Sequence, residues 1–177
     1  MEASLMKPFI TDAFQGGKFV LPFQIEGLPA DQIAVPFEKA GVVAYGLPDS
    51  HTLKAAWLFR LVLNTGWVVD FSSACTEVGE WQEIGSLNLG FASKQPEDSI
   101  RWRTQSLGDF EVKSIERLVY EDAEVYTECG IILTDLTERE IVIAAGPAPG
   151  SVSIATPFST DTFQPELSIE RLQRRPL

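Results

Sequence analysis

Residues 56–71, AWLFRLVLNTGWVVDF, form the most apolar part of the chain, yet they include Arg60 and Asp70. An α-helix does not explain this pattern. Every position of residues 55–63 except Arg60 is apolar, so a helix would have no polar face. A β-hairpin whose loop is Asn64-Thr65-Gly66 explains it better, because Gly66 can take the left-handed conformation that closes three-residue loops.

The hairpin also accounts for the two charges. In its register Leu61 faces Val69 on one side of the sheet, and Arg60 faces Asp70 on the other. Opposite charges at facing positions of neighbouring strands stabilise a sheet by a few tenths to about 1 kcal/mol. We therefore predict a hairpin here and interpret Arg60 and Asp70 as a structural ion pair.

The remaining segments predict further strands. Residues 87–91 alternate apolar and small or polar side chains, and residues 141–145 are β-branched or small. Residues 18–25 indicate one edge strand, because Pro22 cannot donate a ladder hydrogen bond. We expect one domain, residues 1–177, that is mainly β (α+β being the alternative), with a largely antiparallel sheet forming a sandwich or an open barrel. A few short helices are predicted, at residues 31–39 and 166–174.

No segment has the 18 or so uninterrupted apolar residues of a membrane span. Residues 1–14 lack the basic and apolar regions of a secretion signal. The two cysteines, Cys75 and Cys129, are too few for a disulfide framework and are expected to be free thiols. These features predict a cytoplasmic protein that does not contact a membrane.

The charge is unevenly distributed. The net charge is −11, and residues 70–140 contain 16 acidic and 6 basic side chains. Nucleic-acid binding requires a positive surface, so this excess argues against it. It favours a basic protein partner, because complementary charge speeds association and suppresses wrong partners.

Recognisable catalytic and metal-binding motifs are absent from the sequence. His51 is the only histidine, and its position in a predicted turn indicates an exposed side chain. No GxSxG, GxxxxGK[ST] or GxGxxG motif occurs, and residues 146–150, GPAPG, predict a turn. One histidine and two distant cysteines cannot form a zinc-type cluster. We therefore predict no catalytic residue, metal or cofactor.

Acidic residues gather in two predicted turns, and the first of them also contains a tryptophan. Aromatic residues concentrate at the energetically dominant positions of protein interfaces. We therefore predict a partner-binding surface composed of Glu77, Glu80, Trp81, Glu83, Glu121, Asp122, Glu124 and Glu128.

Two segments carry a resemblance to known proteins. They are residues 66–89, GWVVDFSSACTEVGEWQEIGSLNL, and residues 125–154, VYTECGIILTDLTEREIVIAAGPAPGSVSI, which precede Phe163-Gln164-Pro165-Glu166. Both resemble small, acidic bacterial proteins encoded near polymorphic toxins, some of which act as immunity proteins. The resemblance implies stoichiometric binding and neutralisation of a cognate toxin, whose basic character would suit the acidic chain.

Two other hypotheses stay open. The chain could be a small-molecule-binding β domain or a minor enzyme without a recognisable motif, its pocket lined by Trp57, Trp67, Trp81 and Trp102. It could also be a subunit of a homo-oligomer that pairs through the apolar edge at residues 19–23. The sequence does not determine the oligomeric state.

Overall fold

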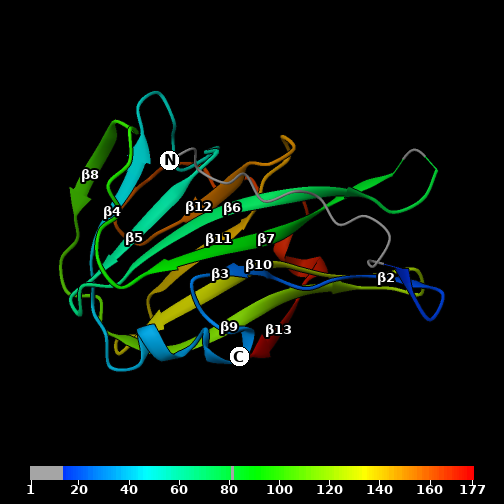
Figure 1. Cartoon of the computed structure of the whole chain (residues 1–177), viewed down its shortest axis with the longest axis horizontal. Helices are drawn as coiled ribbons and strands as arrows, with labels where there is room; N and C mark the ends of the chain where they lie inside the picture. The colour runs from blue at the N-terminus through cyan, green and yellow to red at the C-terminus, as the bar shows by residue number, and fades with distance from the viewer. Residues whose placement is uncertain (1–13, 81) are drawn as a thin grey trace.

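The computed structural model describes residues 14–80 and 82–177, which form two β-sheets packed face to face (Figure 1). We call them the β6 sheet and the β10 sheet. The β6 sheet has the order β3 (Gln24–Glu26), β7 (Glu83–Ala92), β6 (Val68–Glu77), β5 (Phe59–Leu63), β4 (Val42–Pro48) and β8 (Trp102–Ser106).

The β10 sheet is centred on β10 (Val125–Asp135). On one side of β10 are β9 (Val112–Glu121) and β13 (Gln173–Pro176); on the other are β1 (Phe14–Gln15), β2 (Lys18–Leu21), β11 (Glu140–Ala145) and β12 (Val152–Ala155). Only β2–β10 and β3–β7 pair in parallel; the other pairs of named strands within the described residues are antiparallel. The predicted mainly β, largely antiparallel fold is confirmed, and its two layers form a sandwich.

The hairpin predicted from residues 56–71 is present as β5 and β6. Leu61 faces Val69 and Arg60 faces Asp70, as predicted. Gly66 has a φ of 93°, in the left-handed region that the loop requires. The observed register is therefore the one that the local sequence predicts.

The core lies between the two sheets. The β6 sheet contributes side chains such as Leu61, Phe71 and Leu89, and the β10 sheet contributes Ile131 and Ile143, all of them almost fully buried. Full burial of each such side chain stabilises the fold by about 1.5–3 kcal/mol. One core cluster connects the two sheets, and the three cavities described below are not lined by Trp57, Trp67 or Trp102.

The β10 sheet is buried on its outer face as well. Leu118, Ile132 and Val142 point away from the β6 sheet and pack against Phe163 and Leu172 of the C-terminal segment. Burial on both faces explains why residues 129–133 of β10 and 141–145 of β11 are continuous runs of apolar or small residues instead of alternating patterns.

Residues 18–25 do not form one edge strand, so that prediction is wrong. The chain leaves the β10 sheet after β2, passes Pro22, and joins the β6 sheet as β3. The missing N–H of proline suits a crossing point, where no ladder continues. β2 pairs with β10 along residues 19–21 and with β1 at Lys18 and Phe19, so β1 covers only the start of the edge suggested for homo-oligomer formation.

The predicted helices are shorter than expected. Residues 31–39 contain only two 3₁₀ turns, η2 (Ala30–Gln32) and η3 (Val35–Phe37), and the C-terminal segment contains η4 (Ile169–Arg171). The end of that segment is strand β13, which pairs with β9 instead of continuing a helix. Strand pairing along β9 supplies backbone partners that an isolated helical turn lacks.

Candidate functional site

The two acidic segments lie at the same end of the sandwich, toward the right in Figure 1. One follows β6 and leads into β7; the other is the turn between β9 and β10. An apolar cluster joins them, in which Val78 and Ile84 of the first segment pack with Val125 of the second. We call this region the hairpin end. The cluster brings together two acidic segments that are separated in sequence.

Three of the predicted partner-binding residues have exposed carboxylates without a partner. Glu77, Glu80 and Glu124 form no hydrogen bond or ion pair through their side chains within residues 14–80 and 82–177. No described cation neutralises their charge, so each of them is available to a cationic partner.

Two further predicted residues are exposed but already bonded. Glu121 forms ion pairs with Lys18 at 2.9 Å and Arg175 at 2.7 Å. The hydrogen bonds from Lys18 and Arg175 hold the pKa of Glu121 below its usual range. Asp122 accepts hydrogen bonds of 2.8 Å from the backbone N–H groups of Glu124 and Val125, which also lower its pKa. Asp122 therefore shapes the β9–β10 turn.

Glu128 does not belong to the accessible surface, because it is 4% exposed. Its carboxylate accepts a hydrogen bond of 3.1 Å from the Phe23 backbone N–H and pairs with Arg117. Phe23 lies where the chain crosses between the two sheets, so Glu128 holds this crossing in place. Its role in the structure is internal.

Glu83 borders a small cavity of about 100 Å³ against the GPAPG turn. The Cys75 thiol lies 3.5 Å from the Glu83 carboxylate, and Glu166 accepts a hydrogen bond from the Gly85 N–H at 2.9 Å. Burial raises the pKa of the Cys75 thiol to about 11, and the neighbouring carboxylates add to the effect. A thiol with this pKa is not a nucleophile at neutral pH. Trp81, the remaining predicted residue, lies outside the described residues.

Glu166 has an unusual environment in the same cavity. Burial raises the pKa of Glu166; the hydrogen bond from Gly85 opposes this, and the charge of Glu83 adds to it. Sequence analysis did not identify Glu166 as a site residue, because its cavity forms only when the C-terminal segment folds back on β7. Both cysteines are free, as predicted, and Cys129 is buried in β10.

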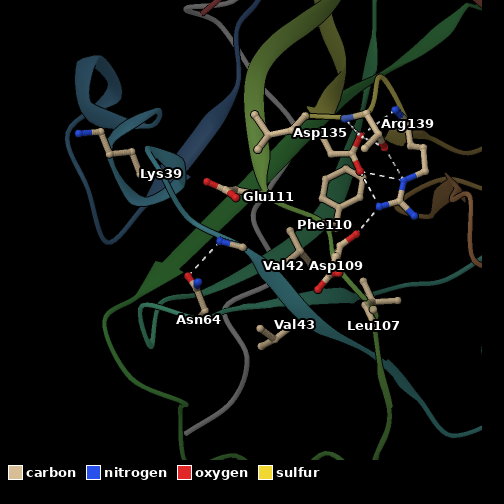
Figure 2. Close-up of a pocket in the computed structure, with 14 residues that line it drawn as sticks. Lys39, Val42, Val43, Asn64, Leu107, Asp109, Phe110, Glu111, Asp135 and Arg139 are labelled. Carbon is tan, nitrogen blue, oxygen red and sulfur yellow. Dashed lines mark hydrogen bonds and ion pairs between the residues drawn. The ribbon is translucent and has the colours of Figure 1, made fainter.

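A larger hollow lies at the opposite end of β6 and β10, which we call the loop end (Figure 2). It has a volume of about 610 Å³, and loops from both sheets line it. In Figure 2 the Arg139 guanidinium lies beside Asp135, on the other side of the hollow from Lys39. Val43 and Leu136, two of its apolar lining residues, are 41% and 59% exposed.

Asp135 is the most strongly bonded carboxylate at the loop end. It accepts hydrogen bonds from the backbone N–H groups of Thr137 and Arg139, from the Thr137 hydroxyl and from the Arg139 Nε, at 2.8–2.9 Å. Burial acts to raise the pKa of Asp135, but these hydrogen bonds outweigh it and lower the pKa. The charge of Asp135 thus fixes the β10–β11 turn and is not available to a ligand.

The Arg60–Asp70 pair is part of a larger cluster on the outer face of the β6 sheet. Arg60 donates two hydrogen bonds to Asp70, at 2.7 and 2.8 Å, and one to Asp98 at 3.0 Å. Its guanidinium lies over the ring of Trp102, 4.0 Å from the ring centre. The cluster covers Arg60, which is 3% exposed, and no cavity described above includes Asp70. The cluster contains the Arg60–Asp70 ion pair that the facing positions predict.

The single histidine is not idle. His51 is half-buried, and its Nδ1 accepts a hydrogen bond from the Trp57 N–H at 3.3 Å. It also lines a third cavity, beside Tyr45 and Arg103. The expectation of an exposed side chain was wrong because the chain folds back between β4 and β5.

No known protein family, curated protein or solved structure matches the chain. Within the described ranges, no group of three or more acidic, cysteine or histidine side chains could hold a metal ion. The helical segments in the same ranges are all too short to cross a membrane.

Proposed function

We propose that this protein is a non-enzymatic binding domain that recognises a basic protein through its hairpin end. One observation carries the proposal: Glu77, Glu80 and Glu124 come from two packed segments, are exposed, and have no side-chain partner in the described chain. Carboxylates left unpaired at one site create a negative field that attracts a cationic surface and orients it.

Exposed aromatic surface supports the same site. Phe14 is 56% exposed, and it contacts Phe19 of β2, which packs against the apolar cluster of the hairpin end. Aromatic side chains supply much of the binding energy at protein interfaces, while charged residues at the rim provide steering and specificity. An apolar group among free carboxylates thus suits a basic partner that also presents an apolar patch.

We further propose that the partner is a toxin-like basic domain, neutralised by a one-to-one complex in the cytoplasm. The support for this is the resemblance of residues 66–89 and 125–154 to immunity proteins encoded near polymorphic toxins. A basic nuclease-type surface would complement the hairpin end, since such a surface is built to bind phosphates.

The test uses the full chain as bait in extracts of its native cells, with bound proteins identified by mass spectrometry. We expect one basic partner, bound one to one, whose expression alone is toxic. The triple variant Glu77→Gln/Glu80→Gln/Glu124→Gln should bind that partner at least about tenfold more weakly, because three interfacial charges are lost.

A matched variant controls for the change in net charge. Glu38, Glu97 and Glu111 are exposed and lie away from the hairpin end, so converting all three to Gln changes the net charge equally. If both triple variants weakened partner binding equally, the effect would come from non-specific electrostatic attraction. Absence of any stoichiometric partner, or unchanged affinity of the hairpin-end variant, would overturn the proposal.

A further inference from the structure

A third cavity, of about 250 Å³, lies at the open side of the sandwich where β4 and β8 face the segment that follows β12. Its walls come from β4, from the β4–β5 connection, from β8 and from residues 159–161. It contains none of the residues of the hairpin end. Its volume is below the 300–1,000 Å³ typical of drug-sized ligands, so it suits a smaller molecule.

Opposite charges face this cavity without pairing with each other. Arg103 and Asp161 both line it, but they form no ion pair, and Asp161 has no side-chain partner in the described chain. Arg103 donates one hydrogen bond, to the His51 carbonyl oxygen, which anchors its guanidinium at the cavity and leaves other N–H groups without a described partner. Two opposite charges whose only role was to stabilise the fold would contribute more stability by forming a direct ion pair.

Uncharged polar groups lie between the two charges and the core. The Tyr45 hydroxyl donates a hydrogen bond of 2.8 Å to the Gln105 side chain. Burial raises the pKa of Tyr45; Asp161 raises it further, and Arg103 opposes this. Both charges therefore influence the same hydroxyl group, from opposite directions. Because His51 Nδ1 accepts the Trp57 N–H, a neutral ring carries its proton on Nε2, which can donate.

We propose that this cavity binds a small zwitterion of the α-amino-acid type, with its carboxylate on Arg103 and its ammonium group on Asp161. The guanidinium fork matches a carboxylate in geometry as well as charge. A carboxylate such as Asp161 is acceptor-only and suits the three donors of an ammonium group. Leu47 and Leu53 supply an apolar wall, so an amino acid with an apolar side chain should bind better than one with a charged side chain.

Isothermal titration calorimetry of the full chain with each common L-amino acid tests this. We expect at least one apolar amino acid to bind with a Kd of about 1 mM or tighter. Its N-acetyl derivative lacks the ammonium charge and its amide lacks the carboxylate charge. Both derivatives should therefore bind at least about tenfold more weakly, since each loses a charge-assisted contact.

Two variants assign the charges. Arg103→Gln should weaken binding about tenfold and remove the preference for the free acid over the amide. Asp161→Asn should likewise remove the preference for the free amine over the N-acetyl form. Arg101 and Asp49 provide matched controls, because they form an exposed ion pair outside the cavity and their substitution makes the same charge changes.

Near-UV circular dichroism shows whether each variant keeps its fold. If Arg103→Gln unfolds, Asp161→Asn with the N-acetyl comparison still decides the question, because Asp161 contributes no side-chain bond to the described fold. Three outcomes would each overturn the proposal. Both variants could bind the amino acid as tightly as the parent chain, or the two derivatives could bind as well as the free amino acid. Alternatively, no amino acid could bind with a Kd below about 10 mM. These outcomes are independent of the hairpin end.

Discussion

Asp135 at the loop end is 1% exposed and accepts four hydrogen bonds, whereas Glu77, Glu80 and Glu124 at the hairpin end are exposed and accept none from described residues. All four carboxylates belong to the acidic middle of the sequence. The comparison shows that local donors determine whether a carboxylate stabilises the fold or is available to a partner. Three single variants and one triple variant, at carboxylates that differ in how many hydrogen bonds they accept, test this comparison.

Asp135→Ala should have the largest effect. It leaves the N–H groups of Thr137 and Arg139 without their acceptor, and the free energy of unfolding should fall by about 3 kcal/mol. Urea denaturation at pH 7 measures the loss. Asp109→Ala is the control, because Asp109 is exposed at the same end and its side chain has no described partner. Similar losses in both variants would remove the distinction between bonded and free carboxylates.

The Asp135 contribution should also depend on pH in one direction. The folded-state pKa of Asp135 is lowered, so its stabilisation is fully present above the unfolded-state pKa of about 3.9. It is lost as the pH falls through the folded-state pKa. The difference between the parent chain and Asp135→Ala should therefore shrink in acid, and a constant difference down to the acid transition would contradict this assignment.

Asp70→Asn should have the second-largest effect, about 2 kcal/mol. It removes the charged partner of Arg60, which is 3% exposed, and among the described residues leaves Asp98 as the one carboxylate on that guanidinium. Thermal unfolding of the variant beside Asp49→Asn, at an exposed pair, gives the comparison. A variant as stable as the parent would show that Asp98 alone neutralises Arg60.

Glu166→Gln should produce a smaller effect of opposite sign. The folded-state pKa of Glu166 is raised, so ionisation at higher pH favours the unfolded chain, in which the pKa is lower. Glutamine removes that cost and can still accept the Gly85 N–H. The variant should gain stability, within about 1 kcal/mol, at pH 7–8 and none at about pH 4. A loss of stability at pH 7–8 would show that the carboxylate is stabilised by its surroundings.

The triple variant of Glu77, Glu80 and Glu124 should change stability least, by about 0.5 kcal/mol or less. None of the three side chains bonds within the described chain, so the fold loses no contact. Unfolding by guanidinium chloride measures this change. Because the denaturant is a salt, it screens surface charge, and the measured free energy then reports mainly on direct contacts. A loss of several kcal/mol would show that these carboxylates stabilise the fold, as Asp135 does, and would argue against the proposed partner site.

Sequence analysis predicted the parts of the fold that neighbouring residues determine. The β5–β6 register follows from a glycine loop and from the facing charges of Arg60 and Asp70, all within a few residues. It could not predict that residues 18–25 divide between two sheets. Nothing in that segment indicates β7 and β10 as separate partners. Pro22 indicated that the strand is interrupted, but not that the chain then joins the other sheet.

The candidate sites show the same limit. The sequence shows the acidic turns, but in it Glu128 resembles the neighbouring acidic residues. Only its contacts with Arg117 and with the Phe23 backbone N–H, in the folded chain, reveal that Glu128 is buried. The cavity between Arg103 and Asp161 brings together strand β8 and the segment after β12. Side chains this far apart in sequence converge only through tertiary structure, so periodicity and local motifs cannot identify the site.

The crossing at Pro22 also has a consequence during synthesis on the ribosome. Strands β2 and β3 emerge early, but their parallel partners are β10 and β7, and the Phe23–Glu128 bond spans 105 residues. Until those partners have been translated, the early strands expose unpaired backbone groups that invite association with other nascent chains. Contacts of such long sequence separation also slow folding. Strands β2 and β3 thus emerge before β7 and β10 and complete their pairing only after them, so aggregation during this interval is a hazard for the nascent chain.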